Sequence, residues 1–183
     1  MVRRLAIALA TITLGVAGRA AAPPAIFTLI GKSTASYASQ ANFPATSPEL
    51  RPDRHDNSYR SPAVGTYHIL LLAGPRQDMM SFRVGQLTNP AIRLPAGSRL
   101  TLNVVNVDDD MVHDLDITAQ PPPYPQAAPA SPMGTAVLRP YKGKGYSSAT
   151  LILKAQHAGT VYYFCSVPGH ARHGMWGKIV VTP

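Results

Sequence analysis

The amino-acid sequence predicts an all-β sandwich of seven or eight strands, and three observations support this fold class. The 183 residues include 18 prolines and 14 glycines, a composition that favours short strands and many turns over long helices. Between residues 66 and 183, short strand-like runs recur, each bounded by turn residues. In one run, apolar Leu100, Leu102 and Val104 alternate with polar residues, as in a strand with one buried face.

The expected strands follow one another at short intervals. In order, they cover residues 67–72, 81–87, 91–94, 99–107, 114–118, 149–154, 161–165 and 176–182. Turn-forming residues follow the first three, at Gly74-Pro75, Asn89-Pro90 and Pro95-Ala96-Gly97. A proline-rich loop over residues 120–145 separates the fifth strand from the sixth, and Ala158-Gly159 forms the next turn. We therefore expect one domain over residues 65–183.

The N-terminus has the pattern of a secretion signal. Arg3 and Arg4 precede an uncharged stretch from Leu5 to Gly18, which is followed by small residues. This stretch of 14 residues is short for a membrane span of about 20. We expect a cleaved signal over residues 1–22 and a periplasmic protein, with an uncleaved membrane tether as the alternative. Residues 23–64 show no sustained apolar period and are expected to form a linker or irregular N-terminal extension.

The charge distribution of the sequence limits the classes of function that fit this chain. The formal net charge of +8 falls to +5 when the three arginines of the signal are removed with it. No cluster of lysine and arginine with interleaved aromatic residues occurs, which gives nucleic-acid binding little support. Only 9 residues are acidic, so few carboxylate pairs would be lost as the pH falls, and this hints at acid tolerance.

Cys165 is the only cysteine. A chain with one cysteine cannot form an internal disulfide, a structural zinc site with two or four cysteines, or a dinuclear copper centre with two cysteines. Any metal chemistry at Cys165 therefore uses a single thiolate.

A cluster of potential metal ligands surrounds this cysteine in the sequence. Four residues separate Cys165 from His170, and four more separate His170 from Met175, on a loop between two expected strands. A loop held at both ends can bring a thiolate, an imidazole and a thioether to one point, and His113 upstream can supply a second imidazole. Two histidines, one cysteine and a weak axial methionine define a blue copper electron-transfer site.

Each of these residues also has an ordinary interpretation. A lone cysteine usually behaves as a small buried hydrophobe, and a methionine at the head of a strand usually packs in the core. Their combination at this spacing favours a metal site. The other histidines are given ordinary roles: His68 structural, His157 and His55 outside the core, and His173 exposed near the metal.

The domain resembles the cupredoxins, the type 1 blue copper proteins. The resemblance is carried by residues 81–84, 89–90, 94–97, 113–118, 121–124, 158–165, 168–171 and 174–181. Within the family it is most similar to the rusticyanins, with the membrane-tethered sulfocyanins as the second choice.

The resemblance implies a Greek-key β-sandwich with one type 1 copper per chain, bound by His113, Cys165, His170 and Met175. It also implies a monomeric electron carrier rather than an enzyme. Its partners would be redox proteins such as c-type cytochromes, in the respiratory chain of an acid-living organism.

Two positions depart from the family pattern. Asp114 stands where the family has serine directly after the first ligand histidine, and Asp108 stands where it has asparagine. A carboxylate near the metal favours Cu(II) over Cu(I), so either residue would lower the reduction potential.

Two other functions are considered. A fragment of a copper oxidase or nitrite reductase would carry histidines beside the cysteine, where this chain has Phe164 and Ser166. A periplasmic copper carrier could use soft ligands such as Met111, Met133 and the pair Met79-Met80, although we expect that pair to begin a strand and pack in the core.

Overall fold

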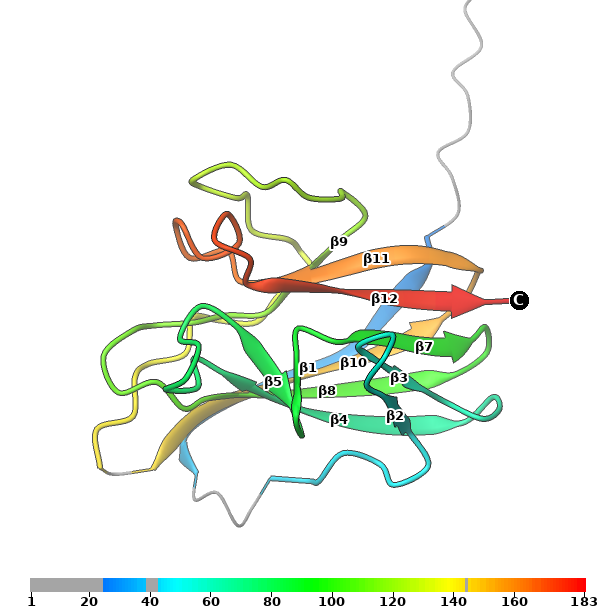
Figure 1. Cartoon of the computed structure of the whole chain (residues 1–183), viewed down its shortest axis with the longest axis horizontal. Helices are drawn as coiled ribbons and strands as arrows, with labels where there is room; N and C mark the ends of the chain where they lie inside the picture. Colours follow the sequence, from blue (N-terminus) through cyan, green and yellow to red (C-terminus); the bar gives the residue numbers. More distant parts are fainter. Residues whose placement is uncertain (1–24, 39–42, 144) are drawn as a thin grey trace, which may run out of the picture.

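A computed structural model describes residues 25–38, 43–143 and 145–183 and confirms the all-β sandwich. Figure 1 shows the two sheets as layers, with long loops gathered at the left-hand end. Among the described residues, no helix is long and apolar enough to cross a membrane. The secretion signal expected over residues 1–22 lies outside the described residues.

Each sheet has six strands. The first sheet has the order β1 (Phe27–Ala38), β10 (Tyr146–Ala155), β8 (Arg99–Asn106), β4 (Thr66–Ala73), β5 (Phe82–Val84) and β6 (Leu87–Thr88). The second has the order β2 (Arg51–Asp53), β3 (Ser58–Arg60), β7 (Ala91–Pro95), β12 (Trp176–Thr182), β11 (Gly159–Phe164) and β9 (Asp116–Thr118).

The hydrophobic core lies between the two sheets and follows the alternation seen in the sequence. Leu100, Leu102 and Val104 of β8 are fully buried in it. The intervening Thr101 and Asn103 are also buried, so β8 is covered on both faces, unlike the half-buried strand that the alternation predicted. In its sheet, β8 is a central strand between β10 and β4.

Two expectations about secondary structure are corrected. The described part of residues 23–64 is not an irregular linker, because β1 pairs antiparallel with β10, and β3 pairs parallel with β7. The period-2 signal is weak there because β1 and β2 lie at the edges of their sheets. The single strand expected over residues 81–87 is instead the hairpin β5–β6, which turns at Gly85 with φ of 55°.

The pairing in the second sheet brings distant parts of the chain to one end of the sandwich. β11 pairs antiparallel with β12, with Phe164 opposite Trp176, and β9 flanks β11 with Asp116 opposite Phe164. The loop between β11 and β12 therefore lies beside the chain that enters β9. Both segments lie at the left-hand end in Figure 1.

Candidate metal centre

Three of the four predicted ligands meet in the structure. The ligand atoms of His113, Cys165 and His170 all lie within 4.8 Å of one another, and all three residues are buried. The Cys165 Sγ atom lies 3.4 Å from His170 Nδ1 and 3.9 Å from His113 Nδ1. The two imidazole rings lie 4.9 Å apart between centroids.

The loop of residues 165–175, here called the ligand loop, places Cys165, His170 and Met175. Cys165 follows the last residue of β11, and Met175 precedes the first residue of β12. The Cys165 N–H donates to the Met175 carbonyl at 3.1 Å, and the Met175 N–H donates to the His170 carbonyl at 3.0 Å. Met175 is fully buried in the same core cluster as Cys165.

His113 reaches the site from the other segment, the loop between β8 and β9. It forms an isolated antiparallel bridge with Leu138, so it precedes β9 rather than opening it. Its Nε2 atom lies 3.2 Å from Asp108 Oδ2, while its Nδ1 faces Cys165. An ionised carboxylate only accepts hydrogen bonds, so Nε2–H donates to Asp108 and Nδ1 keeps its lone pair free. A carboxylate on the distal nitrogen is the usual support of a metal-binding histidine.

The pKa values of these groups suit that arrangement. Burial raises the pKa of Asp108, but hydrogen bonds from the N–H groups of Asp110 and Met111 outweigh it and lower the value to about 2. Burial lowers the pKa of both His113 and His170, which keeps the imidazoles neutral. Burial, with the nearby Asp114 carboxylate, raises the pKa of Cys165, so a metal is needed to displace the thiol proton.

Asp108 and Asp114, the two departures from the family pattern, contact different residues of the site. Asp108 contacts His113, as described above. Asp114 is buried and accepts hydrogen bonds from the Ser166 N–H at 2.6 Å and the Ser166 hydroxyl at 2.5 Å. Asp114 also presents its own N–H to Cys165 Sγ at 3.5 Å. Both carboxylates therefore lie at the site.

Sequence reasoning missed three residues that support the site. A Cβ atom at Gly74 would collide with His113 Nε2 and lie 2.7 Å from Asp108 Oδ2, so this position requires glycine. Asn89 and Gln126 each form a hydrogen bond to the ligand loop. In the sequence, Asn89-Pro90 was a turn signal and part of the family resemblance, and neither indicated these contacts.

The other histidines differ in their places, and His173 lies on the ligand loop, where its N–H donates to the His170 carbonyl. His55, His157 and His173 are exposed, whereas His68 lies half-buried within β4. Met79 is 43% exposed in the turn before β5, so the expectation that the Met79-Met80 pair begins a strand in the core is wrong for Met79.

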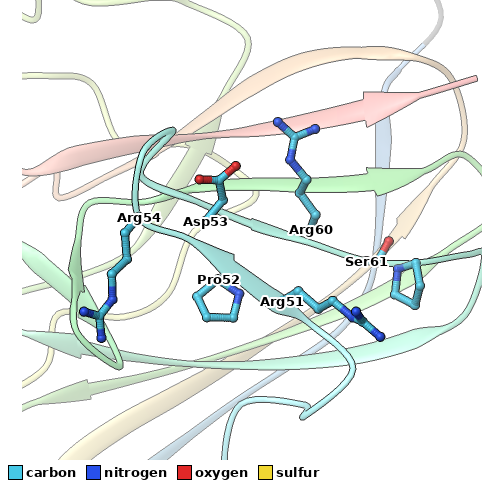
Figure 2. Close-up of a pocket in the computed structure, with 7 residues that line it drawn as sticks. Arg51, Pro52, Asp53, Arg54, Arg60 and Ser61 are labelled. Atoms are coloured by element: carbon cyan, nitrogen blue, oxygen red, sulfur yellow. The ribbon is translucent and has the colours of Figure 1, made fainter.

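A pocket of about 400 Å³ lies elsewhere, on the β2–β3 hairpin. Figure 2 shows Arg51, Arg54 and Arg60 spreading away from one another around it. None of the predicted ligands lines this pocket, so it is separate from the metal centre.

The donor set fits a copper ion. Imidazole nitrogens and thiolates bind a metal ion of this size at about 2.0 and 2.3 Å, so two donors that share one ion lie roughly 3 to 4 Å apart. The two sulfur–nitrogen distances fall in this range. Two histidines with one cysteine form the trigonal set of a type 1 copper site.

Comparison with known proteins agrees with this assignment. The family described as the sulfocyanin (SoxE) domain matches residues 59–183. Rusticyanin of Acidithiobacillus ferridurans is 32% identical over 177 residues, 93% of each chain. Rusticyanin of Acidithiobacillus ferrooxidans is 38% identical over 121 residues, 63% of each chain.

Solved structures show the same fold. The structure of rusticyanin from Thiobacillus ferrooxidans matches with a TM-score of 0.64 and 29% identity, over 73% of this chain and 88% of that chain. The structure of reduced rusticyanin matches with a TM-score of 0.65 and 28% identity, over 83% of this chain and 100% of that chain.

Proposed function

The chain belongs to the cupredoxin family that contains the rusticyanins and sulfocyanins, and we propose that it is a type 1 blue copper protein that carries single electrons between redox proteins. The observation that carries this proposal is the buried group of His113, Cys165 and His170, whose ligand atoms lie within 4.8 Å of one another. Without these converging ligand atoms, the proposal would rest on similarity of fold alone, and a fold does not define a function.

The proposed ligands are His113, Cys165 and His170, with Met175 as the weak axial ligand. Bound copper would supply one-electron chemistry, because the soft sulfur ligands suit Cu(I) while imidazole suits both oxidation states. Asp108 fixes the orientation of the His113 ring, and the backbone bond from Cys165 to Met175 ties the two ends of the ligand loop together. The protein thereby holds one donor arrangement for both oxidation states.

Burial of the ligands supports a carrier rather than an enzyme. Cys165, His113 and Met175 are fully buried, so these ligands leave little room for a substrate at the metal. His170 retains 5% exposure and is therefore the proposed route by which electrons leave and enter. Electron transfer through a ligand edge requires contact with a partner but no bond to it.

We further propose that the partner is a c-type cytochrome in the periplasm, reached after export by the N-terminal signal. Gly169 and Ala171 beside His170 are buried. The exposed residues of the same stretch are Pro168, Arg172 and His173. A small surface of this kind around the edge of His170 suits the weak, transient contacts of redox partners.

A copper titration tests this function. We expect the purified apoprotein to bind one Cu(II) per chain and become intensely blue, because a thiolate bonded to Cu(II) gives a strong charge-transfer band. One equivalent of ascorbate should bleach the colour, and a mild oxidant should restore it over repeated cycles. A colourless Cu(II) complex, or copper released on each reduction, would instead indicate a copper-binding or copper-carrying protein.

A further inference from the structure

Within the described part of the chain, three hydrogen bonds reach the backbone of the ligand loop from distant segments, besides the bond from the adjacent Trp176 N–H to the Gly174 carbonyl at 2.7 Å. The Ser166 N–H donates to Asp114, the Gly169 N–H donates to the Gln126 carbonyl at 2.6 Å, and the Gly174 carbonyl accepts from Asn89 Nδ2 at 2.9 Å. Each of these loop residues is the direct neighbour of one proposed ligand. The Asn89 bond is the one beside Met175.

The geometry of Asn89 fixes which of its amide atoms faces the loop. Its backbone N–H donates to the Phe82 carbonyl at 2.7 Å, and its Oδ1 accepts the Phe82 N–H at 2.8 Å. Oδ1 must face that N–H, so Nδ2 must face the Gly174 carbonyl. Asn89 holds a φ of 48°, a left-handed conformation that asparagine tolerates better than most residues.

Pro90, the residue after Asn89, is hydrogen-bonded to β11, the strand that ends directly before Cys165. The Tyr163 hydroxyl is fully buried and donates to the Pro90 carbonyl at 2.7 Å. Tyr163 lies in β11, two residues before Cys165. A continuous set of bonds therefore runs from the Cys165 strand through Pro90 and Asn89 to the peptide that precedes Met175.

We infer that Asn89 is a positioning residue for Met175. Pairing of Trp176 with Phe164 holds the chain after Met175. At the peptide before it, the Gly174 N–H donates to Ala171 within the loop, and the Gly174 carbonyl accepts from the adjacent Trp176 N–H and from Asn89. Among these bonds, the Asn89 bond is the one that joins this peptide to a distant segment of the chain. A weak, long axial bond cannot fix the place of its own ligand, so the protein scaffold must do so. This inference rests on the proposed copper function and adds a residue that sets the axial interaction.

The test compares Asn89→Gly with Asn57→Gly in the copper-loaded protein. Glycine accepts the left-handed conformation at both positions, so each change removes only the side-chain bonds. Asn57 is the matched control, because it is exposed, has φ of 44°, and donates from Nδ2 to the Thr88 carbonyl at 2.8 Å without contacting the ligand loop.

We expect Asn89→Gly to change the electron paramagnetic resonance spectrum, the ratio of the two main visible absorption bands and the reduction potential. Release of Cu(I) to a chelator should become about fivefold faster or more, the factor expected for the loss of one hydrogen bond. Asn57→Gly should match the parent in all four measurements.

A second variant guards against loss of folding. Asn89→Asp keeps the acceptor for Phe82, replaces the donor to Gly174 by a carboxylate oxygen and adds a negative charge. It should change the spectra in the same way. Spectra and potential equal to those of the parent in both Asn89 variants, even with lower thermal stability, would overturn the positioning role. A parent protein that is not blue would refute the proposed function and this inference with it.

Discussion

The two segments that form the metal centre hold it by different means. Residues 106–118 surround His113 with buried polar side chains, namely Asn106, Asp108, Asp114 and Asp116. The ligand loop of residues 165–175 contains no carboxylate and is held by backbone hydrogen bonds and the three ties from outside. The first segment therefore supplies the electrostatics of the site, whereas the second supplies its shape and its access to solvent.

The two proposed histidine ligands differ in the same way as the segments that carry them. His113 is fully buried and supported by a carboxylate, while His170 keeps 5% of its surface exposed. A ligand of the first kind fixes the metal, and a ligand of the second kind connects it to a partner. The predictions below perturb the contacts of these two segments or the contacts that join them.

The largest effect is expected from removing each imidazole in turn. His113→Gly and His170→Gly should both lose the type 1 visible spectrum when loaded with copper. Added imidazole should restore the blue colour in His170→Gly, because solvent reaches that position, and should fail in His113→Gly. Absorption spectra recorded during imidazole titration decide this, and equal rescue of both variants would remove the distinction between the segments.

Crowding the carboxylate side of the site should weaken copper binding. The added methyl group of Gly74→Ala would press on His113 and Asp108, and φ of 70° is unfavourable for alanine. Gly143→Ala is the matched control, since Gly143 has φ of 75° and no atom within 4 Å of the added Cβ. Competition with a Cu(II) chelator should show weaker affinity for Gly74→Ala alone, and equal affinities would mean that His113 adapts freely.

Asp114 joins the two segments, and its loss should destabilise the apoprotein. Asp114→Ala leaves the half-buried N–H and hydroxyl of Ser166 without their acceptor, which should cost about 1–3 kcal/mol of unfolding free energy. The exposed Asp78→Ala should change the stability by less than about 0.5 kcal/mol. Urea unfolding at pH 7 measures both, and identical midpoints would show that water replaces Asp114.

The smallest effect is a pH dependence at Asp116. Burial raises its pKa from 3.8 to about 6, so between these values the folded protein keeps a proton that the unfolded chain has lost. The stability that this proton on Asp116 contributes to the folded protein is therefore fully present below pH 4 and is lost as the pH rises through 6. An amide at position 116 does not titrate, so the Asp116→Asn variant does not lose this stability as the pH rises. The free energy of unfolding of the variant, relative to that of the parent, should therefore be higher at pH 7 than at pH 4 by about 2 kcal/mol or less.

Urea unfolding of the apoprotein at the two pH values measures this difference. Any constant cost of the amide cancels, because it acts at both pH values. Asp78→Asn serves as the exposed control. A relative stability that does not change with pH would show that Asp116 is ionised throughout this range.

Sequence patterns predicted the sandwich because turn residues bound nearly every strand of the core. They predicted the convergence of Cys165 and His170 because both lie on one short loop between paired strands. They could not reveal β1, because an edge strand with one neighbour buries little apolar surface and leaves little periodic signal. Gly74 and Asn89 were equally hidden, since their contacts join segments far apart in the chain.

X-ray absorption at the copper edge tests the central claim most directly, because it reports which atoms bind the metal. The copper-loaded protein should show one short copper–sulfur bond and two imidazole nitrogens, the trigonal set of a type 1 site. In Cys165→Ser the short sulfur bond should disappear. Copper bound only through nitrogen and oxygen in the parent would contradict the account.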